Sequence, residues 1–132
     1  MSSQPHAIVP RHTDAAPAAI GPYSQSVSID SLLFTSGQVG LDPQTGELVP
    51  GGFEPQAHQV FANLTAVLAS AGCGWNDVVK AVVFLADMSD FPTLNRIYAE
   101  TMGAHKPARS TVQVAGLPKG ARAEVELVAR IP

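Results

Sequence analysis

The stretch Val78-Val79-Lys80-Ala81-Val82-Val83-Phe84-Leu85-Ala86 is rich in valine and apolar apart from Lys80. Branched side chains of this kind favour an extended backbone, and a near-continuous apolar run is typical of a strand that is covered on at least one face. We therefore predict a strand over residues 78–86 that lies in the centre of a sheet.

Apolar residues on both sides of this strand recur with the spacing of a helix. Between Pro55 and Gly72 one helical face carries Ala57, Val60, Phe61, Leu64, Val67, Leu68 and Ala71. Pro55 suits the first helical turn, and Gly72 suits the left-handed residue that follows a helix end. After the strand, Ser89 or Asp90 can cap a second helix, whose inward side carries Phe91, Leu94, Tyr98 and Met102.

Further strands are expected towards both ends of the chain. Residues 26–29 and 32–36 form two strand-like runs around Asp30-Ser31, which predicts a β-hairpin, and Ile8 with Val9 predicts a short edge strand before it. The glycine-containing segment 37–40 is expected to be a loop whose backbone approaches another group closely. Residues 107–114 and 123–131 are expected to form an antiparallel pair around a turn at 116–120.

The order of these elements is β-β-α-β-α-β-β, which predicts an α+β fold with a mixed sheet and two helices packed on one face. The chain has 132 residues, which fits one domain. We expect an N-terminal segment over residues 1–15, which carries the edge strand, and a single domain over residues 16–132.

Charge and composition exclude several classes of function. Charged residues make up 14% of the chain and the net charge is −3, so no basic surface for nucleic acid is evident. The 45% of hydrophobic residues favours a buried subunit interface. No run reaches the roughly 18 apolar residues of a membrane span. Cys73 is the only cysteine, so we expect no disulfide framework, no zinc cluster and a cytoplasmic location.

Arg109 is the first candidate binding residue. Alternation along a strand places Arg109, Thr111 and Gln113 on one face and Val112 with Val114 on the other. The planar, permanently charged guanidinium matches a carboxylate or a phosphate with two parallel hydrogen bonds. The competing interpretation is an arginine at the solvent edge of a strand, whose stem covers apolar surface.

Glu124 is the candidate acid or base. Beside an apolar wall its pKa would be raised, and the carboxyl group could position a water and pass a proton to a leaving amine; an exposed structural carboxylate is the alternative. In a hairpin symmetric about residues 118 and 119, Gln113 lies opposite Glu124, and Arg109 lies about 13 Å further along its strand. This distance favours a site completed across a subunit boundary over an asymmetric hairpin or converging long side chains.

Several segments together resemble one family. They are Gly21-Pro22-Tyr23-Ser24-Gln25, Phe34-Thr35-Ser36-Gly37-Gln38, Asn63-Leu64, Asp90-Phe91 with Asn95 and Tyr98, and Pro107-Ala108-Arg109-Ser110 with the later Glu124. In this order they resemble the YjgF/RidA family, from about Ala16 to Arg130. Each motif alone is weak, whereas the ordered set is specific.

The resemblance implies a chorismate-mutase-like fold that assembles as a homotrimer, with sites between neighbouring subunits. It implies a cofactor-free deaminase, without a metal, that hydrolyses reactive enamines and imines, such as 2-aminoacrylate and 2-iminopropanoate, to 2-keto acids and ammonia. Such intermediates leak from pyridoxal-phosphate enzymes. By this resemblance Arg109 and the Gly37 N–H bind the substrate carboxylate, and Glu124 orients the attacking water. The pocket is completed by Tyr23, Ser36, Asn95 and the backbone at Thr111.

The chain departs from the family pattern at a few positions. Thr111 replaces a common cysteine, Lys106 replaces a common aromatic residue, and the segment from Tyr98 to Arg109 is shorter than usual. These differences bear on pocket shape and substrate preference. Two other functions remain as alternatives: a non-enzymatic module that binds small carboxylates in the same cleft, and an endoribonuclease or translation inhibitor, which the acidic balance disfavours.

Overall fold

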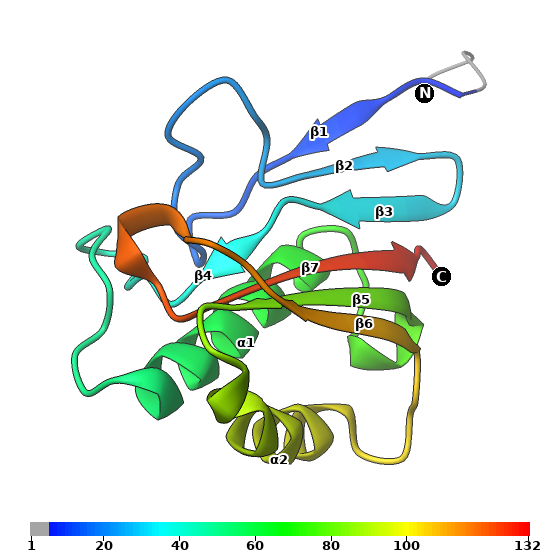
Figure 1. The fold of residues 1–132 in the computed structure, drawn as a ribbon. Helices are drawn as coiled ribbons and strands as arrows, with labels where there is room; N and C mark the ends of the chain where they lie inside the picture. The colour runs from blue at the N-terminus through cyan, green and yellow to red at the C-terminus, as the bar shows by residue number, and fades with distance from the viewer. Residues whose placement is uncertain (1–5) are drawn as a thin grey trace.

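The computed structural model describes residues 6–132; residues 1–5, the start of the expected N-terminal segment, lie outside that part. Its sheet contains the strands β1 (Val9–Arg11), β2 (Ser26–Ile29), β3 (Leu32–Thr35), β4 (Gln38–Val39), β5 (Val78–Leu85), β6 (Ala108–Gln113) and β7 (Ala123–Arg130). Two helices, α1 (Phe53–Ala69) and α2 (Phe91–Met102), cover one face of this sheet and leave the other open (Figure 1). The predicted α+β architecture is confirmed.

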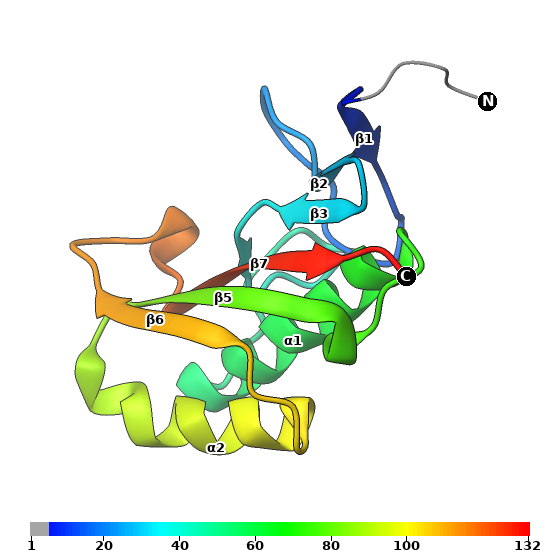
Figure 2. The ribbon, with the colours of Figure 1, turned by 90° about the vertical axis from the view of Figure 1, so that its right-hand side faces the viewer.

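The strands follow the order β1-β2-β3-β7-β5-β6, and β4 also pairs with β7. β5 corresponds to the predicted central strand and lies between β7, which is antiparallel to it, and β6, which is parallel. The predicted hairpin is confirmed as β2 and β3, with Val27 opposite Phe34. The predicted edge strand is confirmed as β1, which pairs with β2. Seen from the side, β6 is the outermost strand next to β5, and α2 lies beneath it (Figure 2).

The predicted antiparallel pair of residues 107–114 and 123–131 is wrong. β5 separates β6 from β7, so Gln113 lies opposite Leu85 and Glu124 lies opposite Phe84. Two strands joined through a helix form a parallel crossover unit, and β5-α2-β6 is such a unit. Because β6 occupies one side of β5, β7 pairs with the other side.

Two local predictions also need correction. The segment 37–40 is not entirely a loop, because Gln38–Val39 forms β4 and pairs with β7. Asp90 occupies the N-cap position of α2, but its carboxylate accepts a hydrogen bond from the Arg122 guanidinium and none from the helix backbone. The side-chain cap in this region is Asp87, which accepts from the Ser89 N–H at the start of the 3-10 turn Met88–Asp90.

The helical predictions are otherwise confirmed. The apolar face of α1 is buried against the sheet through Ala57, Val60, Phe61, Leu64, Val67 and Leu68. Gly72 follows the helix end with a φ of 75°, a left-handed conformation that glycine adopts without the strain of a side chain. None of the helices in residues 6–132 is long and apolar enough to cross a membrane.

Alternation along the strands assigns each side chain to a face of the sheet. Ala81, Val83 and Leu85 of β5 are buried on the face that the helices cover. The open face instead carries large apolar side chains that a single chain leaves uncovered: Phe34 is 40% exposed and Val112 is 45% exposed. An extensive apolar face of this kind is typical of a protein interface.

Candidate active site

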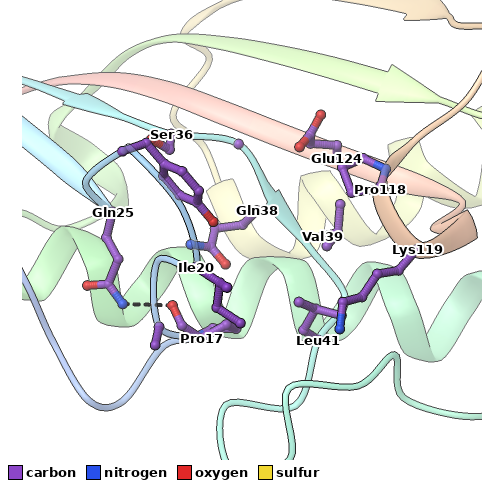
Figure 3. A pocket seen from close by; sticks show the side chains of 13 residues that line it. Pro17, Ile20, Gln25, Ser36, Gln38, Val39, Leu41, Pro118, Lys119 and Glu124 are labelled. Atoms are coloured by element: carbon purple, nitrogen blue, oxygen red, sulfur yellow. Dashed lines mark hydrogen bonds between the residues drawn. The ribbon is translucent and has the colours of Figure 1, made fainter.

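Two cavities contain six of the seven residues that the sequence predicts for a site, and Thr111 lines neither of them. The first, the glutamate cavity, has a volume of about 610 Å³ and lies between the loop before β2, β4 and the loop before β7 (Figure 3). It is lined by Pro17, Ala18, Ile20, Tyr23, Gln25, Ser36, Gly37, Gln38, Val39, Leu41, Pro118, Lys119 and Glu124. The second, the arginine cavity, has a volume of about 480 Å³ and is lined by Asn95, Tyr98, Ala99, Met102, Gly103, His105, Lys106, Pro107 and Arg109.

Arg109 is held in place by α2. It lies on the edge strand β6, opposite the buried Ala81, and therefore faces the helices. Its Nη1 donates a 2.8 Å hydrogen bond to Asn95 Oδ1. Its Cζ lies 4.7 Å from the centre of the Tyr98 ring and 5.6 Å from that of Phe91. Aromatic faces attract a guanidinium without consuming its hydrogen-bond donors, so the remaining donors stay available to a ligand.

The positive charge of Arg109 has no carboxylate partner among residues 6–132. The predicted shared face is confirmed: Thr111 follows Arg109 on the helix side, opposite Val83, whereas Val112 lies opposite Phe84 on the open side. The Thr111 hydroxyl is buried and has no hydrogen-bond partner in the described part of the chain. A planar cation with free donors in a cavity is suited to a small carboxylate.

Glu124 occupies a contrasting environment on the open face of the sheet. It lies opposite Phe84 on β7 and is half-buried. Burial raises the pKa of its carboxyl group, and the nearby Glu126 carboxylate raises that pKa further. A carboxyl group with a raised pKa can hold and release a proton closer to neutral pH, as an acid or base catalyst requires.

Gly37 provides the close backbone approach that the sequence predicts. A methyl group at this position would lie 2.6 Å from Glu124 Oε2, so a larger residue would displace the carboxylate. The two other predicted residues of this group lie nearby: Tyr23 is 54% exposed at the cavity, and Ser36 Oγ donates a 2.6 Å hydrogen bond to the Ser24 carbonyl. Lining the same cavity brings Tyr23, Ser36, Gly37 and Glu124 together.

The predicted site residues therefore fall into two groups within one chain. Arg109, Asn95 and Thr111 lie on the helix side of the sheet; the other four line the glutamate cavity. The partners of Arg109 and Glu124 on β5 are Ala81 and Phe84. This offset of three residues across two strand spacings puts their Cα atoms roughly 14 Å apart, on opposite faces. A small ligand cannot touch both side chains of the same subunit.

Sequence reasoning missed several residues that shape these cavities. Gln25 lies in a motif that was singled out, but its role as a cavity residue was not predicted. Lys119 also lines the glutamate cavity, and its Nζ donates to the Gly46 carbonyl at 2.9 Å. The available signals were polar residues inside glycine- and proline-containing turns: Gln25 after Gly21-Pro22, and Lys119 after Pro118.

The described residues offer no ready metal site. Nowhere in residues 6–132 do three or more His, Cys, Asp or Glu side chains gather closely enough to hold a metal ion.

Comparisons with known proteins identify the family of this chain. The family model described as endoribonuclease L-PSP matches residues 13–131. The mouse protein named 2-iminobutanoate/2-iminopropanoate deaminase is 54% identical over 117 residues, which cover 89% of this chain and 87% of that protein. Among solved structures, yeast Mmf1 has a TM-score of 0.92 and 37% identity, with coverage of 96% and 100%. Escherichia coli TdcF with bound serine has a TM-score of 0.86 and 42% identity, with coverage of 92% and 98%. The chain belongs to the endoribonuclease L-PSP family, which is the YjgF/RidA family that its motifs resemble.

Proposed function

We propose that this protein is a cofactor-free hydrolase that converts reactive 2-imino acids and their enamine tautomers to 2-keto acids and ammonia. The observation that carries the proposal is the combination of Arg109, a cation with free donors, and Glu124, a carboxyl group of raised pKa, each at a cavity. Relatives at 50–54% identity are named for this activity on 2-iminobutanoate and 2-iminopropanoate.

The proposed chemistry needs few groups because an imine carbon is already electrophilic. Arg109 and the Gly37 N–H bind the substrate carboxylate, and Glu124 takes a proton from water as the water oxygen adds to the imine carbon. The carboxyl group then gives this proton to the nitrogen. The hydroxyl group then gives its proton to Glu124, which passes it to the nitrogen; the carbon–nitrogen bond breaks with its electron pair going to nitrogen, ammonia leaves, and the former hydroxyl oxygen becomes the keto oxygen.

We propose a homotrimer in which each site lies between two subunits. The arginine cavity of one subunit faces the glutamate cavity of its neighbour, so Arg109, Asn95 and the Thr111 backbone come from one chain and Glu124 with Gly37, Ser36 and Tyr23 from the next. Two observations support this: the two groups lie on opposite faces of one sheet, and the open face is apolar and uncovered. The proposed location is the cytoplasm, where Cys73, which is free, stays reduced.

Release of keto acid from enzymatically generated 2-aminoacrylate tests the function. We expect the wild type to accelerate the reaction over buffer, and Arg109→Ala to lower kcat/KM about 100-fold or more, because a charge-assisted contact to the substrate carboxylate is lost. Arg96→Ala is the matched control, since Arg96 is an exposed arginine that pairs with Glu54 and Glu100. The proposal fails if the wild type gives no acceleration, or if Arg109→Ala is as fast as the wild type.

Two alternatives give distinct results in the same preparation. A non-enzymatic carboxylate-binding module would bind pyruvate in an Arg109-dependent way without turnover. Endoribonuclease activity is the second candidate because the matching family model carries that description. The net charge of −3 disfavours it, since RNA binding normally needs a basic surface. We expect single-stranded RNA to remain intact after incubation with the purified protein.

A further inference from the structure

Gln25 is a buried polar residue with unusually complete hydrogen bonding. It lies just before β2 and is 3% exposed. Its Oε1 accepts a 2.8 Å hydrogen bond from the Thr13 N–H, and its Nε2 donates to the Thr13 carbonyl at 3.0 Å and to the Pro17 carbonyl at 2.8 Å. Figure 3 draws the bond to Pro17 as a dashed line at the lower left. The Gln25 side chain thus satisfies backbone N–H and C=O groups that, in this irregular segment, have no partner in a neighbouring strand.

The segment that Gln25 holds forms one wall of the glutamate cavity. Pro17, Ala18 and Ile20 line the cavity with apolar surface. In the described chain, four hydrogen bonds tie residues 13–20 to the segment just before β2, and all four go to Gln25; a further bond joins Asp14 to the adjacent His12. One amide group therefore supplies the hydrogen bonds that anchor this wall to the start of β2, beside the packing of the buried Ala16 and Pro17.

Gln25 also connects this wall to the catalytic end of the cavity. Its backbone carbonyl accepts a 2.9 Å hydrogen bond from the Ser36 N–H, and the Ser36 hydroxyl donates to the adjacent Ser24 carbonyl. Ser36 precedes Gly37, whose backbone lies against the Glu124 carboxylate. The same residue thus fixes the apolar wall and the backbone beside the acid.

We infer that Gln25 is a positioning residue that holds residues 13–20 over the glutamate cavity and thereby sets which substrate side chains the cavity accepts. The inference rests on the proposed function for the identity of the substrate as a 2-imino acid. In the proposed reaction the substrate carbon that bears the nitrogen lies beside Glu124. The substrate side chain, which is attached to this carbon, then extends towards the apolar wall of Pro17, Ala18 and Ile20. A wall held firmly there excludes bulky groups, and a loose wall admits them.

The chemistry of the amide makes the inference testable. Methionine has a similar length and no hydrogen-bonding N–H or C=O group, so Gln25→Met fills the space and releases the wall. Gln25→Asn keeps the amide but shortens its reach, and it provides a second variant should Gln25→Met fail to fold. Gln44→Met is the matched control, because the Gln44 side chain makes no hydrogen bond in the described structure and lies in the exposed turn after Asp42.

The experiment measures the mobility of the wall and the selectivity of ligand binding separately. Hydrogen exchange of the Thr13 amide reports the bond to Gln25, and dissociation constants for 2-oxobutanoate and 4-methyl-2-oxopentanoate report selectivity without turnover. In Gln25→Met we expect Thr13 exchange to accelerate at least about tenfold, and the preference for the smaller keto acid to narrow by about tenfold. Gln25→Asn should show a smaller change in the same direction, and Gln44→Met should match the wild type.

Each outcome decides the inference. Faster Thr13 exchange with an unchanged ratio of dissociation constants overturns it, because the wall would then be held by Gln25 but would not select. Unchanged Thr13 exchange also overturns it, as does a wild type that binds neither keto acid. If the ratio narrows as expected but the wild type does not hydrolyse 2-aminoacrylate, the role of Gln25 stands and the deaminase proposal fails.

Discussion

The two cavities of this molecule contain key side chains of opposite charge on opposite faces of the sheet. Arg109 lies beneath the sheet, between two aromatic rings and the Asn95 amide. Glu124 lies on the open face, where burial and Glu126 raise its pKa. An arginine stays charged in almost any environment and needs only to be oriented, whereas a carboxyl group that exchanges protons near neutral pH needs a desolvated environment.

The separation of the two groups has a chemical consequence. An arginine in direct contact with Glu124 would lower the pKa of that carboxyl group and would occupy the donors that a substrate carboxylate needs. Placing them on opposite faces of one sheet prevents this contact within a subunit. In the proposed assembly the two charges meet with the substrate between them.

The separation of Arg109 and Glu124 is tested most directly by mixing two variant subunits, each of which lacks one of the two groups. Arg109→Ala and Glu124→Gln should each reduce activity about 100-fold or more, since each removes one half of every site. When both are produced together and assemble at random, about a quarter of the sites in a cyclic trimer receive both intact halves. We therefore expect recovery to about a quarter of wild-type kcat, measured as keto-acid release. Mixed samples that stay as inactive as the single variants would contradict a shared site.

Changing the backbone beside the acid should have the next largest effect. In Gly37→Ala the new methyl group would meet the Glu124 carboxylate, so we expect kcat/KM to fall by about 10- to 100-fold while the fold persists. Gly116→Ala is the control, because a methyl group there has nothing within 4 Å. Equal activity of the two variants would show that the position of Glu124 relative to Gly37 does not matter.

Asn95→Ala tests the orientation of the cation. Loss of the 2.8 Å bond to Arg109 Nη1 should raise KM about tenfold and leave kcat less affected, because the guanidinium keeps its charge but loses its alignment. Asn76→Ala is the control, since Asn76 is exposed and its side chain forms no hydrogen bond in the described structure. A change confined to kcat would argue that Asn95 acts in the chemical step instead.

The smallest expected effect concerns stability. The folded state raises the pKa of Glu124 and therefore favours its protonated form, so folding loses stability as the pH rises from the ordinary value of 4.5 through the raised pKa. Glu124→Gln removes this loss. Its melting temperature should exceed that of the wild type by a few degrees at pH 7, and the difference should shrink at pH 4. A difference that is the same at both values would place the effect elsewhere than in this carboxyl group.

Much of the secondary structure could be predicted from local pattern alone. The apolar spacing of α1, the valine-rich run of β5 and the turn at Asp30-Ser31 each depend on residues that are near one another in the chain. The close approach at Gly37 was also predictable, because glycine permits backbone contacts that other residues block. The ordered motifs were enough to identify the family that the comparisons confirm.

Strand neighbours and the wall of the cavity depended on tertiary structure. Alternation correctly assigned Arg109 and Thr111 to one face, but it contains no information on which strand lies beside β6. Local pattern predicted a hairpin with β7, and the parallel crossover through α2 placed β5 between them. Gln25 shows the same limit: its identity is local, whereas its bonds to Thr13 and Pro17 exist only after the chain has folded back.

The sequence by itself therefore determined the elements, the chemistry of the two key side chains and the family. Only the tertiary structure decided that Arg109 and Glu124 lie on opposite faces and open into different cavities. The physical reason is that periodicity indicates which residues of a strand share a face of the sheet. The neighbouring strands are determined by packing between segments that are distant in the chain.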